Sequence, residues 1–423
     1  MRIALLSYRS KPHVGGQGVY VRHLSRELAR LGHSVEVFSG QPYPELDLLG
    51  EGVSLTKVPS LDLYAEPDPF RNPRLSELRD LVDVEEWLRM RSGAFPEPLT
   101  FARRAMRLLA ERRGEFDVVH DNQTLATPLL GVERLGLPLV TTIHHPISYD
   151  RRIELQSAAG WKKRFGVRRW YSFVRMQARV ARQLPTVITV SESSKRDIVT
   201  EFGVDPGRIR PILLGVPERF VPPTAPRVPG RILAMASADA PLKGIATLLE
   251  AFAKLRTERD VELVLVSKPK PGGVTEQMVD RLSIKDSVRF VHGISDDELV
   301  ALMGSAEIAC VPSLYEGFSL PTAELMACGT PLVASRAGAI PEVTGPDGLC
   351  ADLVTPGDVG ELEQALAALL DDPERRLRYA AAGRARVEEH FSWHAVAEQV
   401  VASYETAIAQ FHASTKEDTR ADR

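Results

Sequence analysis

Short apolar runs alternate with longer amphipathic stretches along the chain. The first run is Ile3 to Ser7, and after a helix-like stretch from Val19 to Leu31 the next run is Ser34 to Ser39. Apolar runs of this length are typical of strands buried on both faces, whereas apolar residues three or four positions apart are typical of helices. The runs FDVVH, LPLVTTIH and PTVITV continue the pattern. Strands that alternate with helices predict a parallel, doubly wound α/β sheet.

A proline-rich segment interrupts this alternation near the middle of the chain. Residues 211–230, PILLGVPERFVPPTAPRVPG, hold six prolines, which neither a helix nor a central strand tolerates. The alternation restarts beyond it with RILAMAS, VELVLVS, SVRFV, AEIACVP and TPLVAS. The pattern therefore predicts two Rossmann-like domains and a linker. The predicted parts are an N-terminal domain over 1–215, a linker over 216–230, a C-terminal domain over 231–395, a helix over 396–411 that packs back toward the first domain, and a frayed tail over 412–423.

One region of the N-terminal half departs from the pattern. From Leu61 to Leu99 the chain carries five prolines mixed with four aromatic residues, and we interpret it as a long loop. Loops of that length inside a domain are usually functional or disordered. The aromatic residues argue against disorder.

Composition narrows the classes of protein. With 423 residues, the chain exceeds one ordinary hydrophobic core, and 44% hydrophobic and 26% charged residues are typical of globular proteins. The 53 basic and 56 acidic residues give a net charge of −3, so bulk charge offers no support for nucleic-acid binding. No stretch is long and apolar enough for a signal peptide or a membrane span. The three cysteines form no C-x-x-C pair, and we expect a cytoplasmic protein with reduced thiols.

The strongest local signal is PSLYEGFSLPTAELMACGTPLVAS, which starts at Pro312. It places Glu316 on a loop after a strand and Glu324 eight positions later on the following helix. Gly317 allows a close approach of the backbone to a ligand, and the helix that begins near Phe318 offers unpaired N–H groups that suit a diphosphate. Carboxylates accept hydrogen bonds well from sugar hydroxyls.

This segment resembles the retaining family 4 glycosyltransferases, also called glycosyl transferases group 1. Their pattern, P-S-x-x-E-G-F-x-x-x-x-x-E-x-x-A-x-G-x-P, is present in every fixed position. The resemblance extends over nearly the whole chain, through VGGQGVYVRHLSRELARLGHSVEVFS, VITVSESSKRDI and PLKGIATLLEAFAKL. It implies the GT-B fold, two Rossmann-like domains facing a central cleft. It also implies transfer of a hexose from a nucleotide-diphosphate sugar with retention of configuration, Glu316 contacting the donor sugar and Glu324 holding the ribose.

The resemblance assigns further residues. Lys243 matches a lysine that faces the donor diphosphate, and a fixed cation there stabilises the departing phosphate. A histidine after the strand LPLVTTIH touches the donor sugar in the family; we take it to be His144, although His145 leaves the assignment open. The family's usual arginine is replaced by Ala238, and Lys268 is a candidate to compensate.

A glycine pair before the first long helix adds to the site. It is either a plain tight turn or a backbone loop that closes over the donor phosphate or the acceptor. With it, the expected site is complete. The expected catalytic residues are His144, Lys243 and Glu316. The expected donor-binding residues are Gly15, Gly16, Ser237, Asp239, Lys243, Gly317, Phe318, Ser319, Leu320 and Glu324.

The sequence indicates no metal site and no cofactor. No Asp-x-Asp pair or His/Cys cluster is present, so we expect turnover without a metal and a UDP- or GDP-sugar as the co-substrate. A phosphorylase or epimerase of the same fold is one alternative, although no lysine marks a pyridoxal phosphate site. A protein that binds nucleotide sugars without catalysis is the other, motivated by the missing arginine.

Residues 151–183 form a basic amphipathic segment. They contain ten Lys and Arg residues against Glu154 alone, and on one helix the arginines would share a face opposite Trp170 and Phe173. The segment is either an ordinary surface helix packed on its domain or a contact with anionic lipid headgroups. Relatives in the resembled family act on lipid acceptors, which favours a lipid-linked or amphiphilic acceptor and peripheral attachment at the inner face of the membrane. The expected contact residues are Trp161, Lys162, Lys163, Arg168, Arg175 and Arg179.

Overall fold

The computed structural model describes residues 1–10, 16–65, 67–235 and 239–421, with side chains as far as 414. The chain divides into two compact units. The first unit comprises residues 1–213 together with 393–423, and the second comprises residues 214–392. The predicted domain limits were residues 215 and 395. The chain thus leaves the first unit once and returns to it through its last helix.

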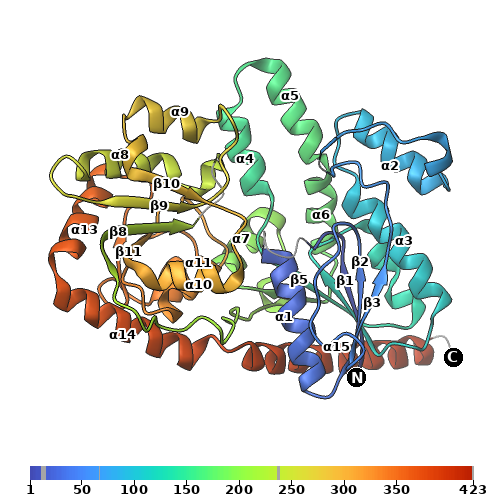
Figure 1. Ribbon diagram of the computed structural model, residues 1–423. Coiled ribbons are helices and arrows are strands. Elements are labelled where there is room, and N and C mark those ends of the chain that lie inside the picture. Colours follow the sequence, from blue (N-terminus) through green and yellow to red (C-terminus); the bar gives the residue numbers. More distant parts are fainter. Residues whose placement is uncertain (11–15, 66, 236–238, 422–423) are drawn as a thin grey trace. The chain divides into compact units, whose positions relative to one another are not determined.

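The first unit is built on a seven-stranded parallel sheet in the order β3-β2-β1-β4-β5-β6-β7 (Figure 1). The strands are β1 (Arg2–Ser7), β2 (Ser34–Ser39), β3 (Val53–Lys57), β4 (Val118–Asn122), β5 (Leu139–Ile143), β6 (Thr186–Thr189) and β7 (Ile209–Pro211). All five apolar runs of this half form strands. The short edge strand β7 and the half-exposed β3, with sequence VSLTK, lie outside the predicted strands because neither presents a continuous apolar run.

The first unit also contains helices on and around this sheet. They are α1 (Gly16–Arg30), α2 (Leu81–Arg91), α3 (Glu97–Glu111), α4 (Ser148–Ser157), α5 (Gly160–Trp170), α6 (Val174–Ala181), α7 (Glu192–Phe202) and α15 (Trp393–Ala421). Strand residues Leu6, Phe38 and Val119 share one buried cluster with Phe101 and Leu109 of α3. The apolar face of the helix and the apolar sheet thus form the core.

The second unit repeats the architecture with a six-stranded parallel sheet in the order β10-β9-β8-β11-β12-β13. Its strands are β8 (Val228–Met235), β9 (Glu262–Val266), β10 (Val288–Val291), β11 (Ala306–Val311), β12 (Leu332–Ser335) and β13 (Ala351–Val354). Its helices are α8 (Ile245–Leu255), α9 (Val274–Arg281), α10 (Asp296–Ser305), α11 (Leu320–Ala327), α12 (Ile340–Thr344), α13 (Val359–Asp371) and α14 (Pro373–His390). The predicted α/β class with two Rossmann-like domains is confirmed.

The proline-rich linker ends earlier than residue 230. Strand β8 begins at Val228 and includes Pro229, and Val228 pairs with Ala306 of β11 before the register shifts. Proline is tolerated at the beginning of a strand and at such irregularities. Arg227, just before β8, donates to the carbonyl oxygens of Gly304 and Gly329 at 2.9 and 2.6 Å, so the end of the segment is fixed to the second unit.

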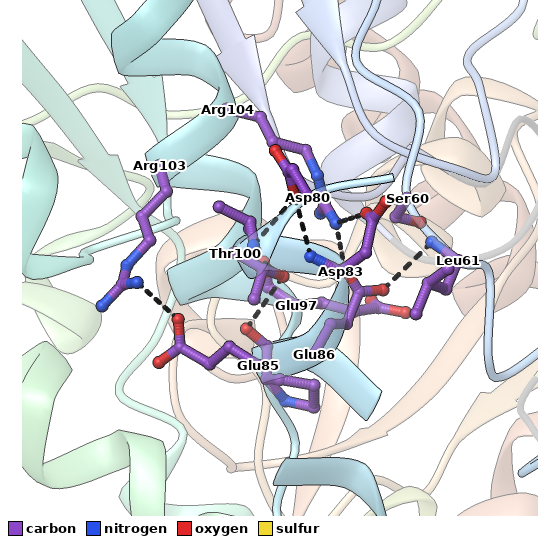
Figure 2. Close-up of polar contacts among 12 residues, drawn as sticks. Ser60, Leu61, Asp80, Asp83, Glu85, Glu86, Glu97, Thr100, Arg103 and Arg104 are labelled. Atoms are coloured by element: carbon purple, nitrogen blue, oxygen red, sulfur yellow. Dashed lines mark hydrogen bonds and ion pairs between the residues drawn. The ribbon is translucent and has the colours of Figure 1, made fainter. Parts of the chain in front are cut away.

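The excursion from Leu61 to Leu99 is not one long loop, because its second half holds α2 and the beginning of α3. The described residues of the excursion before Asp80 contain one 3₁₀ turn, Leu75–Glu77. The prolines of the excursion lie before α2 and at the first turn of α3, where the missing N–H group is not needed. Asp80 caps α2 by accepting hydrogen bonds from the amides of Val82 and Asp83. Figure 2 shows how α2 is then tied to α3: Arg104 contacts both Asp83 and Glu86, each at 2.6 Å.

The basic segment is not one helix. The chain breaks at Ala158 and Ala159 between α4 and α5, and a 3₁₀ turn (Tyr171–Phe173) separates α5 from α6. Burial nevertheless follows the predicted faces in α6, where Arg175 and Arg179 are exposed while the opposite side packs on the core.

The final helix belongs to the first unit. Helix α15 packs on α1 (Figure 1). The ring of Trp393 lies 6.1 Å from the ring of Tyr20 and 5.2 Å from that of His23. Helix α15 begins three residues before the predicted 396 and continues to Ala421, past the expected end at 411, because STKEDTRA contains no helix breaker. No helix in the described part of the chain is long and apolar enough to cross a bilayer.

Candidate active site

The loop between β11 and α11 holds Glu316 at the carboxyl edge of the second sheet, where open α/β sheets bind ligands. The carboxylate is nearly buried, and its Oε1 accepts from Lys243 Nζ at 2.8 Å and from Ser313 Oγ at 2.7 Å. Ser313 is the fixed serine of the family pattern, but sequence reasoning gave it no role; the structure shows that its hydroxyl donates to Glu316.

Two glycines bring Lys243 and Glu316 together. Gly244, in the left-handed conformation, follows Lys243, and a Cβ atom there would lie 1.9 Å from the carbonyl oxygen of Pro312. A Cβ atom at Gly338 would lie 2.1 Å from the carbonyl oxygen of Glu316. Only glycine permits these approaches, so both positions shape the loop that carries Glu316.

The beginning of α11 presents backbone N–H groups beside Glu316. Ser319 has a φ of 82° and ends the loop, and Leu320 is the first helical residue. Phe318 is buried and packs edge-on against Phe391 at 5.8 Å, which fixes the loop from below. Gly317 lies directly before it. The first amides of a helix have no intrahelical acceptor, so this end can bind an anion.

Glu324 lies one turn into α11. Among the described residues, no hydrogen bond to its carboxylate is present. Burial raises the pKa of Glu324 to about 7, opposed by the charge of Arg219 and reinforced by that of Asp296. The group therefore titrates near neutral pH.

Asp239 is committed to the backbone. Its carboxylate accepts from the amides of Lys270 and Thr275, both at 2.9 Å, which ties this loop to the one before α9. This geometry favours anchoring of the loop over direct contact with a donor. The Lys268 side chain is exposed. Ser237 and Ala238 lie outside the described residues.

His144 lies at the end of β5 in the first unit and is 9% exposed. Its Nε2 is 2.7 Å from Asn122 Oδ1, and its ring meets the ring of Tyr20 edge-on at 4.9 Å. Burial lowers the pKa of His144 to about 3, aided by the neighbouring His145. His145 instead places its Nε2 3.1 Å from Asp150 Oδ2. The two histidines thus have different surroundings, a buried neutral ring and a partly exposed one beside a carboxylate.

Gly16 is the first residue of α1, and a Cβ atom there would meet nothing within 4 Å. Gly15 lies outside the described residues. Within the part of the chain that the structure describes, no three His, Cys, Asp or Glu side chains are grouped as metal ligands.

The predicted contact residues lie on α5 and α6. Trp161 and Phe165 are 75% and 64% exposed, and Lys162 Nζ lies 5.7 Å over the Trp161 ring. Lys163, Arg168, Arg175 and Arg179 are also exposed. Trp170, at the end of α5, lies 5.5 Å from Tyr64 and 6.1 Å from Phe70 of the excursion. The two unusual segments therefore pack against each other.

The structure has two Rossmann-like units, and the second holds Lys243 and Glu316 beside the beginning of α11. This arrangement is typical of GT-B glycosyltransferases, which use nucleotide sugars. Residues 14–220 match the family described as "Glycosyltransferase Family 4", and residues 219–386 match "Glycosyl transferases group 1". The chain is 60% identical over 410 residues to an "MMP alpha-(1->4)-mannosyltransferase" of Mycolicibacterium hassiacum, covering 97% of this chain and 99% of that one. It is 30% identical to a glycogen synthase of Mycobacterium tuberculosis, over 99% of this chain and 96% of that one.

Solved structures show the same fold. A sucrose-phosphate synthase from Thermosynechococcus elongatus superposes with a TM-score of 0.72 at 22% identity, covering 97% of this chain and 99% of that one. Anabaena HepE in complex with UDP and glucose does so with a TM-score of 0.69 at 17% identity, covering 96% and 99%. The chain belongs to the family 4 glycosyltransferases. It is a retaining hexosyltransferase that uses a nucleotide-sugar donor, and the comparisons favour this function over a phosphorylase, an epimerase or a non-catalytic protein.

Proposed function

We propose that this enzyme transfers a mannosyl residue from a nucleotide-diphosphate mannose and forms an α-(1→4) bond. The observation that carries the proposal is the 60% identity, over 97% of this chain, to the relative whose name states that reaction. The acceptor would be of the class abbreviated MMP in that name.

In this proposal the donor is bound by the second unit. Lys243 binds the diphosphate together with the first amides of α11, and Glu316 accepts hydrogen bonds from hydroxyls of the sugar. The contact between Lys243 and Glu316 at 2.8 Å supports this, because it puts the charge for the phosphate beside the acceptor for the sugar. Glu324 holds the ribose.

The reaction then proceeds on one face of the sugar. The acceptor hydroxyl oxygen forms a bond to the anomeric carbon as the bond from that carbon to the phosphate oxygen breaks. The acceptor proton passes to the leaving phosphate oxygen, and Lys243 stabilises the charge that gathers on the diphosphate as it leaves. No protein carboxylate serves as a covalent nucleophile in this scheme.

Donor and linkage are tested together. Purified enzyme is incubated with GDP-mannose, GDP-glucose, UDP-glucose or ADP-glucose and a 4-OH mannoside acceptor, and the product linkage is determined by NMR. The proposal expects a mannosylated product with an α-(1→4) bond and binding of the matching donor, detected as a raised melting temperature. Transfer of glucose alone, or a different linkage, would contradict it.

We also expect full turnover in EDTA; a loss that added metal restores would exclude metal-independent catalysis.

A second proposal concerns the acceptor surface. We propose that α5 contacts an amphiphilic or lipid-linked acceptor, or the anionic membrane surface that presents it. Residues 160–166 are all exposed, yet they include two aromatic side chains among three cations. Aromatic and basic residues together are typical of surfaces that bind at a membrane interface. Sedimentation with anionic vesicles tests it.

A further inference from the structure

Asn122, the last residue of β4, is fully buried beside His144. Its side-chain Nδ2 lies 3.4 Å from the carbonyl oxygen of Gln17 at the first turn of α1, and 3.4 Å from Ser7 Oγ at the end of β1. A carbonyl oxygen can only accept, so the amide must turn its N–H groups toward Gln17. Its Oδ1 then faces His144 Nε2 at 2.7 Å, and that nitrogen must carry the proton.

The backbone and the ring of His144 are both held by other residues as well. The carbonyl oxygen of His144 accepts from Ser194 Oγ at 3.0 Å, and Tyr20 meets the ring edge-on. Tyr20 is itself fixed, because its hydroxyl lies 3.0 Å from Thr142 Oγ1. His120 Nε2 contacts the same Thr142 hydroxyl at 2.7 Å.

This chain continues to the last helix. Nδ1 of His120 lies 2.6 Å from the hydroxyl of Tyr404 on α15. Two buried hydrogen-bond groups thus lie behind His144 in the first unit, one around Asn122 and one from Tyr20 to Tyr404, and they meet at the ring contact between His144 and Tyr20. Nδ1 of His144 makes no hydrogen bond to the described residues.

We propose that Asn122 is a positioning residue that fixes His144 in the Nε2–H tautomer, so that Nδ1 accepts a hydrogen bond from a hydroxyl of the donor sugar. The proposal rests on the placement of His144 at the donor sugar that the family resemblance implies. A ring in this state can accept at its open nitrogen and cannot donate there. An imidazolium would reverse that, because both of its nitrogens donate.

The surroundings keep the ring neutral. The titratable groups that act on it are His145 on its own segment, His120 on β4 and Tyr20 on α1, while Asp121 lies next to Asn122 along β4. The two neighbouring histidines disfavour a charge on His144. The carboxylate of Asp121 is occupied by the amides of Thr124 and Leu125, and burial raises its pKa to about 6.

The decisive variant is Asn122→Asp. The new carboxylate still accepts from Nε2 but raises the pKa of His144, so the ring becomes protonated as pH falls and loses its acceptor at Nδ1. The ratio of variant to wild-type turnover should approach a plateau near pH 9 and fall about tenfold per pH unit below the raised pKa. Titration of Asp121 affects both proteins and cancels in the ratio. Asn122→Ala should lower kcat at every pH without introducing a new ionisation.

Controls separate positioning from folding. Gln399→Glu makes the same amide-to-carboxylate change on the exposed face of α15 and should leave the pH profile unchanged. Affinity for the nucleotide diphosphate should stay within about twofold in all variants, because its residues lie in the second unit.

The tautomer is also measurable in the wild-type protein without substrate. Nitrogen-15 NMR of the wild-type protein, with the His144 signals assigned by their loss in His144→Gln, should show a protonated Nε2 and an unprotonated Nδ1 from pH 5 to 8. The opposite tautomer, or a flat activity ratio for Asn122→Asp, overturns the proposal. Neither outcome depends on the donor being a mannose, so failure here is distinct from failure of the proposed function. Full activity of His144→Ala would overturn the role of His144 itself.

Discussion

Lys243 Nζ lies 2.8 Å from Glu316 Oε1, although the two residues are separated by 73 positions and belong to different loops of the second sheet. The contact joins the expected phosphate-binding cation to the expected sugar-binding carboxylate. Separate measurements of turnover and of nucleotide affinity therefore show which of the two functions each residue serves.

Glu316→Gln should lower kcat by about 10²-fold or more, the range seen when one group that stabilises a transition state is removed. Affinity for the free nucleotide diphosphate should change by less than about threefold, because Lys243 and the first amides of α11 remain. Steady-state kinetics and calorimetry with the nucleotide measure the two effects. Ser313→Ala, which removes one hydrogen bond to the same oxygen, should give a smaller loss of kcat. If Glu316→Gln and Glu324→Gln reduce nucleotide affinity equally while turnover per bound donor is unchanged, the assignment of Glu316 to the donor sugar is wrong.

Donor binding should depend on pH through Glu324, because burial raises the pKa of this carboxyl to about 7. Ribose hydroxyls donate to the ionised form, so affinity for the nucleotide sugar should be about tenfold weaker at pH 6 than at pH 8. A nucleotide sugar is used as the probe because its diphosphate has no ionisation in this range. Glu324→Gln should remove the pH dependence while binding weakly throughout.

The same raised pKa has a consequence for stability. A carboxyl group that is harder to ionise in the folded state contributes most below its ordinary pKa, and that contribution is lost as pH rises through about 7. The stability of Glu324→Gln minus that of the wild type should therefore be larger at pH 8 than at pH 5. A constant difference in melting temperature across this range would show that Glu324 is not the titrating group.

The ion pairs of the excursion offer a matched comparison of buried and exposed contacts (Figure 2). Arg104 is almost buried and contacts Asp83 and Glu86, whose side chains are 2% and 1% exposed. Arg104→Ala should destabilise the first unit by about 3–5 kcal/mol, since it leaves the buried carboxylate of Glu86 without its cation, while Asp83 keeps Arg79 at 3.0 Å. The loss should shrink toward pH 5, where Glu86 can take a proton.

Arg103 provides the control for this comparison. It pairs with Glu85 at 2.6 Å but is 44% exposed, so Arg103→Ala should cost less than about 1 kcal/mol. All four tryptophans of the chain lie in the first unit, so tryptophan fluorescence during urea unfolding reports on that unit. Similar losses for the two variants would mean that the Arg104 network does not hold the excursion in place.

Much of the fold could be predicted because buried parallel strands consist of continuous apolar runs, as in β1 and β5. The helices α2 and α3 at the end of the excursion could not be predicted, because the prolines of this region suggest a loop. Only the cap at Asp80 and the contacts of Arg104 reveal them. The division of the basic segment was equally hidden, because the break at Ala158 and Ala159 involves residues that favour helices.

The donor residues could be predicted only where a local pattern carries them. Ser313, Glu316 and Glu324 share one motif, but the motif does not reveal that Ser313 donates to Glu316. Gly338 lies outside the motif and acts through a close approach that spacing does not reveal. Asn122 gave no signal, because its importance comes from the buried amide geometry between β1, α1 and His144. Asp239 gave a signal that pointed to the donor, yet its oxygens are bound to backbone amides.

The exposed aromatic residues of α5 should contribute to membrane or amphiphile binding. Trp161→Ala combined with Phe165→Ala should reduce sedimentation with anionic vesicles by about tenfold or more, because burial of each ring contributes roughly 1.5–3 kcal/mol. Leu377→Ala is the control, since Leu377 is 73% exposed in the second unit, close to the 75% of Trp161. Turnover with a short soluble acceptor should be unaffected in both variants.

The cations of this surface should act with the aromatic residues and depend on salt. Charge reversal at Arg175 and Arg179, which are exposed on α6 while its other face packs on the core, should abolish vesicle binding and leave nucleotide binding intact. Each cation near an anionic surface contributes about 1 kcal/mol, and exposed charges are screened over roughly 8 Å at physiological ionic strength. Binding of the wild type should therefore fall steadily as salt is raised. If the wild type does not sediment with anionic vesicles even at low salt, the membrane proposal fails, and α5 and α6 are helices with a solvated basic face.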